Sequence, residues 1–177
     1  MKEKKELPTL SDLHCDIETA FKNDELKLLL NQPPHLSWVK NNPIAKSKYI
    51  PIDKVELMLD KIFQDWKVEV LREGFMFHSV YVTVRVHYKN PTTGEWSYHD
   101  GVGAKSVQTD SGFSAADLSH IKDAAVMMAL PSAKSFAIKD ACEHLGKLFG
   151  RDLNRKDTIE FTGTYNKPSE SIKIENL

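Results

Sequence analysis

The side chains of this sequence that could do chemistry are mostly basic or aromatic, and they recur at regular spacing. In the segment SVYVTVRVHYK every second residue is polar or aromatic, and this series includes Arg85 and Lys89. Further along the chain, Lys139, Glu143 and Lys147 follow one another at four-residue intervals. Lysines and arginines neutralise phosphates, and aromatic rings stack on any base, so such a set suits the binding of a nucleic-acid backbone.

The same residues have plainer explanations. At four-residue spacing on a helix, Lys139, Glu143 and Lys147 could form surface ion pairs that contribute only a few tenths of a kcal/mol. Arg85 could equally pair with an acidic group across a subunit boundary, because a polar strand face that also bears His87 suits an interface as well as a groove. The sequence leaves these explanations open.

A metal-dependent nuclease is the alternative from a different chemical class. His78, His87 and His99 lie on neighbouring predicted strands, with Asp100 and Asp110 nearby, and such a set could in principle hold a divalent ion. Their spacing matches no ligand pattern. His78 and His87 are an odd number of residues apart, so on one strand they would point to opposite faces. We therefore expect no metal, no cofactor and no catalytic residue.

Two helices are predicted before the strands. The first covers residues 14–30 and stops before Pro33 and Pro34. The second is the segment KVELMLDKIF, whose apolar residues recur at i, i+3, i+4, i+7 and i+8 and so form one face of an amphipathic helix.

Three strands are predicted to follow. They are the segments WKVEVLR, SVYVTVRVHYK and EWSYHDGVGA, and an NPTTG turn joins the last two into an antiparallel hairpin. Gly101 and Gly103 in the third segment lack the third glycine and the following helix of a dinucleotide-binding loop. A bulge or a tight strand end is the expectation for them.

One more helix closes the predicted order α, α, β, β, β, α. A polar segment of residues 106–123 is expected to act as a connector. The helix is then predicted to start at Leu130-Pro131-Ser132 and to stop at Gly150. This order predicts an α+β fold.

Composition and charge bound the class of protein. Hydrophobic residues make up 41% and charged residues 28% of the 177 residues, as in soluble globular proteins. No apolar run approaches the roughly 18 residues needed to span a membrane, no secretory signal is visible, and two cysteines are too few for a disulfide framework. We expect a cytoplasmic protein with no membrane partner.

The net charge is −1, from 24 basic and 25 acidic residues, which by itself does not favour a nucleic-acid partner. The charges are unevenly distributed, however. Residues 36–105 hold ten basic and eight acidic residues, and residues 132–156 hold six and three. The central part of the chain is therefore mildly basic, which is a weak signal on its own.

Four pieces of the sequence, in order, resemble one known family. They are YIPIDKVELMLDKIF followed by a Trp-led strand, the VRVHYK strand, its YHDGVG partner, and the final AIKDACEHLGKLFGRDLNR. Together they are similar to the Rad-fifty-two family of single-strand annealing proteins, especially its short phage members of the Sak type. The resemblance covers residues 36–155, which we expect to form the annealing domain between a peripheral helical segment, 1–35, and a flexible tail, 156–177.

The resemblance implies both a fold and a function. The fold would be a β-β-β-α core, an antiparallel sheet packed on a long helix, with an additional N-terminal helix, and the subunits would assemble into an oligomeric ring. Single-stranded DNA would lie in a basic groove around this homo-oligomer and anneal to a complementary strand during homologous recombination and DNA repair. No ATP would be needed and the protein would not be an enzyme. A single-strand binding protein or an exonuclease would be a candidate partner in a bacterial cell or a phage-infected host.

The resemblance also implies DNA-binding residues at matching positions. Lys40 corresponds to a basic residue that precedes the family's Tyr-Ile lead-in, and Tyr49 corresponds to the lead-in tyrosine. Lys89 closes the Val-Arg-Val strand, where the polar stripe that contains Arg85 also ends. Preference for DNA over RNA rests on the resemblance alone.

The last helix both matches the family and departs from it. Lys147 corresponds to a basic residue of the family, but Glu143 and His144 stand where the family tends to place two adjacent basic residues. A carboxylate that faces phosphate is repulsive, so either Lys139, one turn earlier, has taken over the contact, or this helix face binds a neighbouring subunit. The expected DNA-binding residues are thus Lys40, Tyr49, Arg85, Lys89, Lys139 and Lys147.

The alternative function is a structural or protein-interaction α+β domain that keeps the fold without binding DNA. Every lysine named above could be a solvated surface residue, and the sequence does not decide between the two functions.

Overall fold

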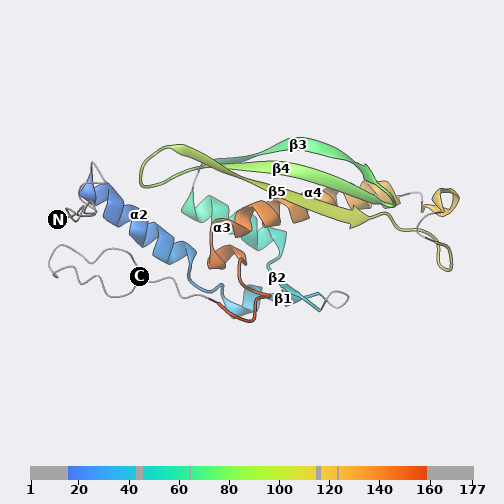
Figure 1. The fold of residues 1–177 in the computed structure, drawn as a ribbon, viewed down its shortest axis with the longest axis horizontal. Coiled ribbons are helices and arrows are strands. Elements are labelled where there is room, and N and C mark those ends of the chain that lie inside the picture. Colours follow the sequence, from blue (N-terminus) through green and yellow to red (C-terminus); the bar gives the residue numbers. More distant parts are fainter. Residues whose placement is uncertain (1–15, 43–45, 64, 115–116, 123, 159–177) are drawn as a thin grey trace, which may run out of the picture.

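The computed structural model describes residues 16–42, 46–63, 65–114, 117–122 and 124–158. Three long strands lie across one long helix, a second helix lies beside it, and a third extends from one end (Figure 1). The predicted order of helices and strands is confirmed.

The sheet consists of β3 (Trp66–Met76), β4 (Ser79–Lys89) and β5 (Trp96–Ser106), in the order β3-β4-β5 and antiparallel throughout. The predicted β4–β5 hairpin is confirmed. Strand β3 runs past the predicted segment, and a β-bulge between Val70 and Arg72 shifts its register with β4. Beyond the bulge, β3 continues to pair with β4 up to the Met76–Ser79 pair.

The core lies between the sheet and α4 (Ala125–Glu143). Alternate residues of β4 are buried against this helix, as the period-two pattern of the sequence requires. These residues are Val80, Val82, Val84 and Val86. The expected α+β fold, with an antiparallel sheet on a long helix and an additional N-terminal helix, is confirmed.

A seam of small residues brings α4 close to β5. The buried alanines of α4 recur at every fourth position, as Ala125, Ala129, Ala133, Ala137 and Ala141. A Cβ atom on Gly101 would clash with the Ala137 carbonyl oxygen, and one on Gly103 would clash with the Ala133 carbonyl oxygen. The expected bulge or strand end at these glycines is therefore wrong. They lie within β5, where the absence of a side chain lets two backbones meet.

Both ends of α4 differ from the prediction. The helix begins at Ala125, so that Pro131, expected near its start, lies inside it. A proline lacks the N–H that would bond the carbonyl four residues earlier, and here that carbonyl belongs to exposed Met127. The helix ends at Glu143, and three residues later Gly146 has a φ of 155° and passes so close to the Leu30 carbonyl that any Cβ atom there would clash. Lys147 is consequently not on α4.

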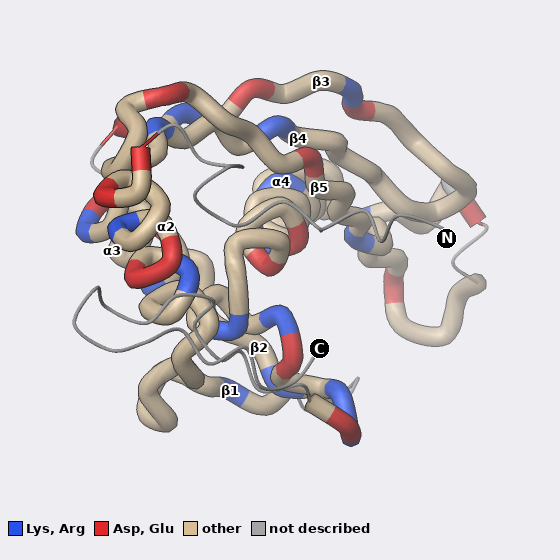
Figure 2. Tube along the Cα trace, turned by 60° about the vertical axis from the view of Figure 1, so that its left-hand side comes forward, with Lys and Arg blue, Asp and Glu red and all other residues tan. Residues whose placement is uncertain are grey.

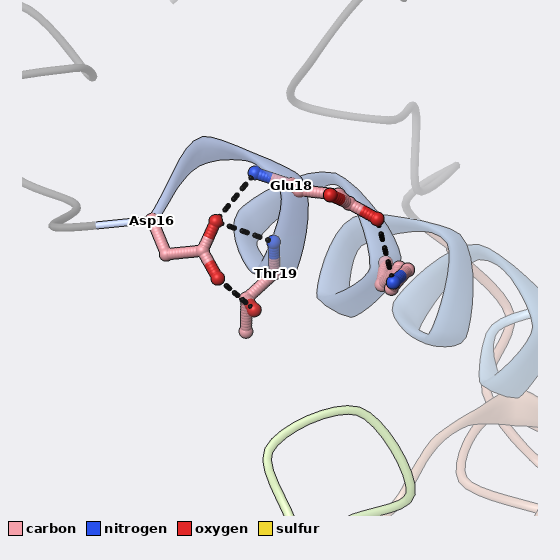
Figure 3. A network of polar contacts seen from close by, with 4 residues as sticks. Asp16, Glu18 and Thr19 are labelled. Carbon is pink, nitrogen blue, oxygen red and sulfur yellow. Dashed lines mark hydrogen bonds and ion pairs between the residues drawn. The ribbon is translucent and has the colours of Figure 1, made fainter.

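The two other helices support the core. Helix α3 (Ile52–Ile62) buries Val55, Met58 and Leu59, which confirms the predicted amphipathic face. Helix α2 (Ile17–Leu30) begins at the Asp16 cap, whose carboxylate accepts hydrogen bonds from the backbone N–H groups of Glu18 and Thr19 (Figure 3). At the far end, Gly146 lies against its last turn.

Short segments complete the described chain. A two-stranded ribbon pairs β1 (Lys40–Asn41) with β2 (Lys48–Tyr49), and 3₁₀ turns cover Leu36–Trp38, Leu118–His120 and Lys147–Phe149. None of the helices in the described part of the chain combines the length and the apolar character needed to cross a membrane. Most of the predicted tail, residues 159–177, lies outside the described residues.

Candidate nucleic-acid interface

A cavity of about 530 Å³ lies between the β1–β2 ribbon, α4 and the edge of β5. We call it the hairpin cavity. Its lining includes Ser47, Tyr49, Val102, Phe136, Lys139 and Glu143. Three segments that are far apart in the sequence therefore contribute to one concave surface.

Lys139 contacts two aromatic rings in this cavity. Its Nζ atom is 4.9 Å from the centroid of the Tyr49 ring and 4.5 Å from that of Phe136. Phe136 and Lys139 share a side of α4 because residues three apart on a helix are neighbours. Each ring is 38% exposed, so both keep surface that a ligand can contact. Burial lowers the pKa of Lys139 from its ordinary value, and the nearby Glu143 opposes that shift.

The β1–β2 ribbon adds basic residues beside the cavity. Lys40 lies directly opposite Tyr49 in the ribbon, and the next residue before Tyr49, Lys48, lines the cavity. Asn154 anchors the ribbon, because its side chain accepts from the Lys48 N–H at 2.7 Å and donates to the Lys48 carbonyl at 2.8 Å. Among the described residues, neither Lys40, Lys48 nor Lys139 forms an ion pair. Figure 2 shows basic positions on this ribbon and on α4.

Two carboxylates also reach the hairpin cavity. Asp140 accepts a hydrogen bond from the Val102 N–H at 2.9 Å, which ties the edge of β5 to α4. Glu143 lies one turn further along α4. Its pKa is raised from the ordinary value, mainly because the surrounding protein desolvates the carboxylate and also because Asp140 repels it. The cavity is therefore not uniformly positive.

The outer face of the sheet carries the other predicted strand residues. Arg85 makes a bidentate pair with Asp100 of β5, at 2.7 and 2.8 Å, and its guanidinium lies 4.0 Å from the Tyr98 ring centroid. Lys89 pairs with Asp65 at 3.6 Å. The hydrogen bonds from Arg85 lower the pKa of Asp100. Acidic side chains of the same chain thus neutralise both basic residues.

Lys147 lies apart from both regions. It belongs to the 3₁₀ turn Lys147–Phe149, and its side chain, 18% exposed, pairs with Asp152 at 3.8 Å. The expected i, i+4 series with Lys139 and Glu143 does not continue to it, because α4 has already ended.

Two of the three histidines in the metal-site alternative have other contacts. His87 Nε2 lies 2.9 Å from Glu69, and His99 Nε2 lies 3.1 Å from the Tyr88 hydroxyl. Burial, together with the neighbouring His144, lowers the pKa of His99. In the ranges that the structure describes, no group of three His, Cys, Asp or Glu residues lies close enough to hold a metal ion.

The structure therefore groups Lys40, Tyr49 and Lys139, and separates them from the remaining three predicted residues. Sequence reasoning missed Lys48 and Phe136. An aromatic residue three positions before a lysine on the polar side of a helix was the signal for Phe136. No sequence signal marked Lys48, because lysines are common in loops.

Comparisons with known proteins give no family for the chain. A scan against protein-family models finds no match, and a search of curated proteins finds no similar sequence.

Proposed function

We propose that the chain binds single-stranded DNA in the hairpin cavity and along the β1–β2 ribbon, and that it anneals complementary strands without nucleotide hydrolysis. This is the activity implied by the resemblance to the Rad-fifty-two family. The protein would act in homologous recombination and repair as a strand-annealing factor of the phage type.

One observation carries this proposal. Tyr49, in the β1–β2 ribbon, and Lys139, on α4, come from separate parts of the sequence and line one cavity, with the Lys139 ammonium over the Tyr49 ring. Lys40 lies opposite Tyr49 in the ribbon. A chance selection of surface lysines has no reason to converge in this way.

The chemistry of annealing fits these groups. Lysines beside the cavity neutralise phosphates, which lowers the repulsion between two strands, and exposed rings hold bases without reading their sequence. Pairing of the two strands supplies the free energy, so that no hydrolytic residue is required. The residues that carry the proposal are Lys40, Lys48, Tyr49 and Lys139.

Assembly into a ring is part of the proposal, and the uncovered side of β3 supports it. Helix α4 packs on β4 and β5, whereas β3 lies beyond its cover. Val70, Phe75 and Met76 of this strand are 44%, 67% and 56% exposed. An apolar strand at a sheet edge is a surface that a neighbouring subunit would bury.

The second candidate function is a protein-interaction domain that binds no DNA. It is favoured by the outer face of the sheet, where Arg85 and Lys89 are already paired with acidic residues and cannot be spared for phosphate without breaking those pairs. DNA binding requires the lysines of the hairpin cavity, whereas an interaction domain that binds no DNA does not.

The test is an annealing assay with two labelled complementary oligonucleotides, in EDTA and without ATP, over a series of salt concentrations. We expect the protein to accelerate annealing, and the acceleration to fall as salt rises, because phosphate contacts release counterions. Lys40→Ala should weaken it, and Lys89→Ala should serve as the matched control that does not.

Two results would contradict the proposal. A protein that neither binds single strands nor accelerates annealing is the interaction domain instead. Activity that returns only when a divalent ion replaces EDTA, together with strand cleavage, revives the nuclease and directs attention to the histidines.

A further inference from the structure

The hairpin cavity contains a carboxylate, which would repel the phosphates of a bound strand. Glu143 lines the cavity one helical turn from Lys139. Among the described residues, no hydrogen-bond donor contacts its carboxylate, whereas Asp140 is engaged by the Val102 N–H. In the described part of the chain, Glu143 is thus a cavity carboxylate that accepts no side-chain hydrogen bond.

The remaining lining suits a flat aromatic ligand. The Tyr49 and Phe136 rings both contact the Lys139 ammonium, and each residue has exposed surface. The volume of about 530 Å³ falls within the range of roughly 300–1,000 Å³ that is typical of small-ligand pockets. Glu143 belongs to the same lining as both rings, so its carboxylate is available as an acceptor to a ligand that stacks here.

The chemistry of a carboxylate decides which edge it accepts. An ionised carboxylate only accepts hydrogen bonds, so it favours bases whose edges present amino groups. Cytosine presents its N4 amino group. Thymine presents one imino N–H between two carbonyl oxygens, which the carboxylate repels. Glu143 would therefore discriminate between two pyrimidines that stack similarly.

We propose that the hairpin cavity receives a nucleobase of the bound strand rather than a phosphate, and that Glu143 makes it prefer amino-bearing bases such as cytosine over thymine. This inference rests on the proposed function, since it names the part of the DNA that the cavity binds. Phosphates then follow the ribbon side, along Lys40 and Lys48, and the exposed surface of the Tyr49 and Phe136 rings holds the base.

The experiment compares oligo(dC) and oligo(dT) of equal length for binding to the full chain by fluorescence anisotropy. The wild-type protein should bind oligo(dC) about tenfold more tightly, the discrimination expected of one base contact. Glu143→Gln should remove that difference, because an amide both donates and accepts. Glu73→Gln, on the exposed part of β3, is the matched control and should keep it.

A second readout follows the ring contacts. A 2-aminopurine base within the oligonucleotide should lose fluorescence on binding as it stacks, and Phe136→Leu should reduce this quenching at saturating protein. Lys40→Ala should weaken affinity but leave the quenching at saturation unchanged. Thermal melting of each variant identifies any loss of folding.

The outcomes separate this inference from the proposed function. If Glu143→Gln strengthens binding of both oligonucleotides equally, Glu143 merely repels phosphate and the inference is overturned. Equal wild-type binding of both, with annealing intact, also overturns it and leaves the proposed function standing. Failure to bind either oligonucleotide overturns the proposed function itself.

Discussion

The hairpin cavity and the outer face of the sheet both contain basic residues beside aromatic rings, but the two regions differ in whether these residues are paired with carboxylates. In the cavity, Lys139 contacts aromatic rings and forms no ion pair with any acidic group that the structure describes. On the outer face, Arg85 lies over the Tyr98 ring but is held by Asp100, and Lys89 is held by Asp65.

This difference indicates that a basic residue is a candidate for binding phosphate only when a neighbouring carboxylate does not already neutralise its charge. Paired cations present little net field to an approaching phosphate, whereas a lysine that contacts only rings keeps its charge for a ligand. The near-neutral net charge of −1 therefore says little about the chain's affinity for DNA.

The largest effect should come from moving α4 away from β5, which breaks the cavity but not the outer face. Gly101→Ala places a Cβ atom against the Ala137 carbonyl oxygen. We expect a loss of about 1–3 kcal/mol of stability, as for other overpacked cores, measured by denaturant unfolding. Gly74→Ala is the control, because its Cβ atom meets only the end of the Tyr81 side chain. Equal losses in both variants would mean that the seam is not tight.

The second effect tests the comparison directly through two double variants. Lys40→Ala with Lys48→Ala should lower the salt dependence of single-strand binding by about 1.4 in the slope of log affinity against log salt, from about 0.7 per phosphate contact. Arg85→Ala with Lys89→Ala should leave the slope nearly unchanged. A larger change in the second pair would reverse the comparison and place DNA on the outer face.

The third effect provides a reference that belongs to neither region. Phe77 is 93% exposed in the β3–β4 turn and has a φ of 54°, in the left-handed region. That conformation costs a residue with a side chain about 1 kcal/mol or more, so Phe77→Gly should raise the free energy of unfolding by up to about 1 kcal/mol. Single-strand binding should not change. Reduced binding would mean that the turn itself contacts DNA.

The smallest effect concerns the exposed pair of Arg85 and Asp100. The lowered pKa of Asp100 means that its contribution to stability is present above the ordinary value of 3.8 and is lost as pH falls through the lowered pKa. Asp100→Asn should therefore melt slightly below the wild type at pH 7 and at the same temperature in strong acid. A difference that persists in acid would have a cause other than the charge of Asp100.

Much of the fold could be predicted because periodicity alone determines it. The alternating valines of β4 and the apolar face of α3 have one plausible partner each, namely the core. The ends of α4 could not be predicted. Pro131 is a usual start signal, and the close passage of Gly146 beside Leu30, just beyond the helix end, depends on a contact between distant segments.

The candidate site was predictable in part, for a different reason. The resemblance to the Rad-fifty-two family suggested Lys40, Tyr49 and Lys139, but the pairing of Arg85 with Asp100 depends on the register between two strands, which the pattern of residues does not give. Phe136 was overlooked because an aromatic residue on a helix is ordinarily assigned to the core.

The seam of alanines and glycines between α4 and β5 fixes how far apart two walls of the hairpin cavity stand. Backbone atoms in contact set this spacing, so the choice of exposed side chains around the opening does not alter it. A protein engineer could therefore exchange Glu143, Phe136 or Lys139 to change what the cavity prefers, with the seam serving as a scaffold of constant width.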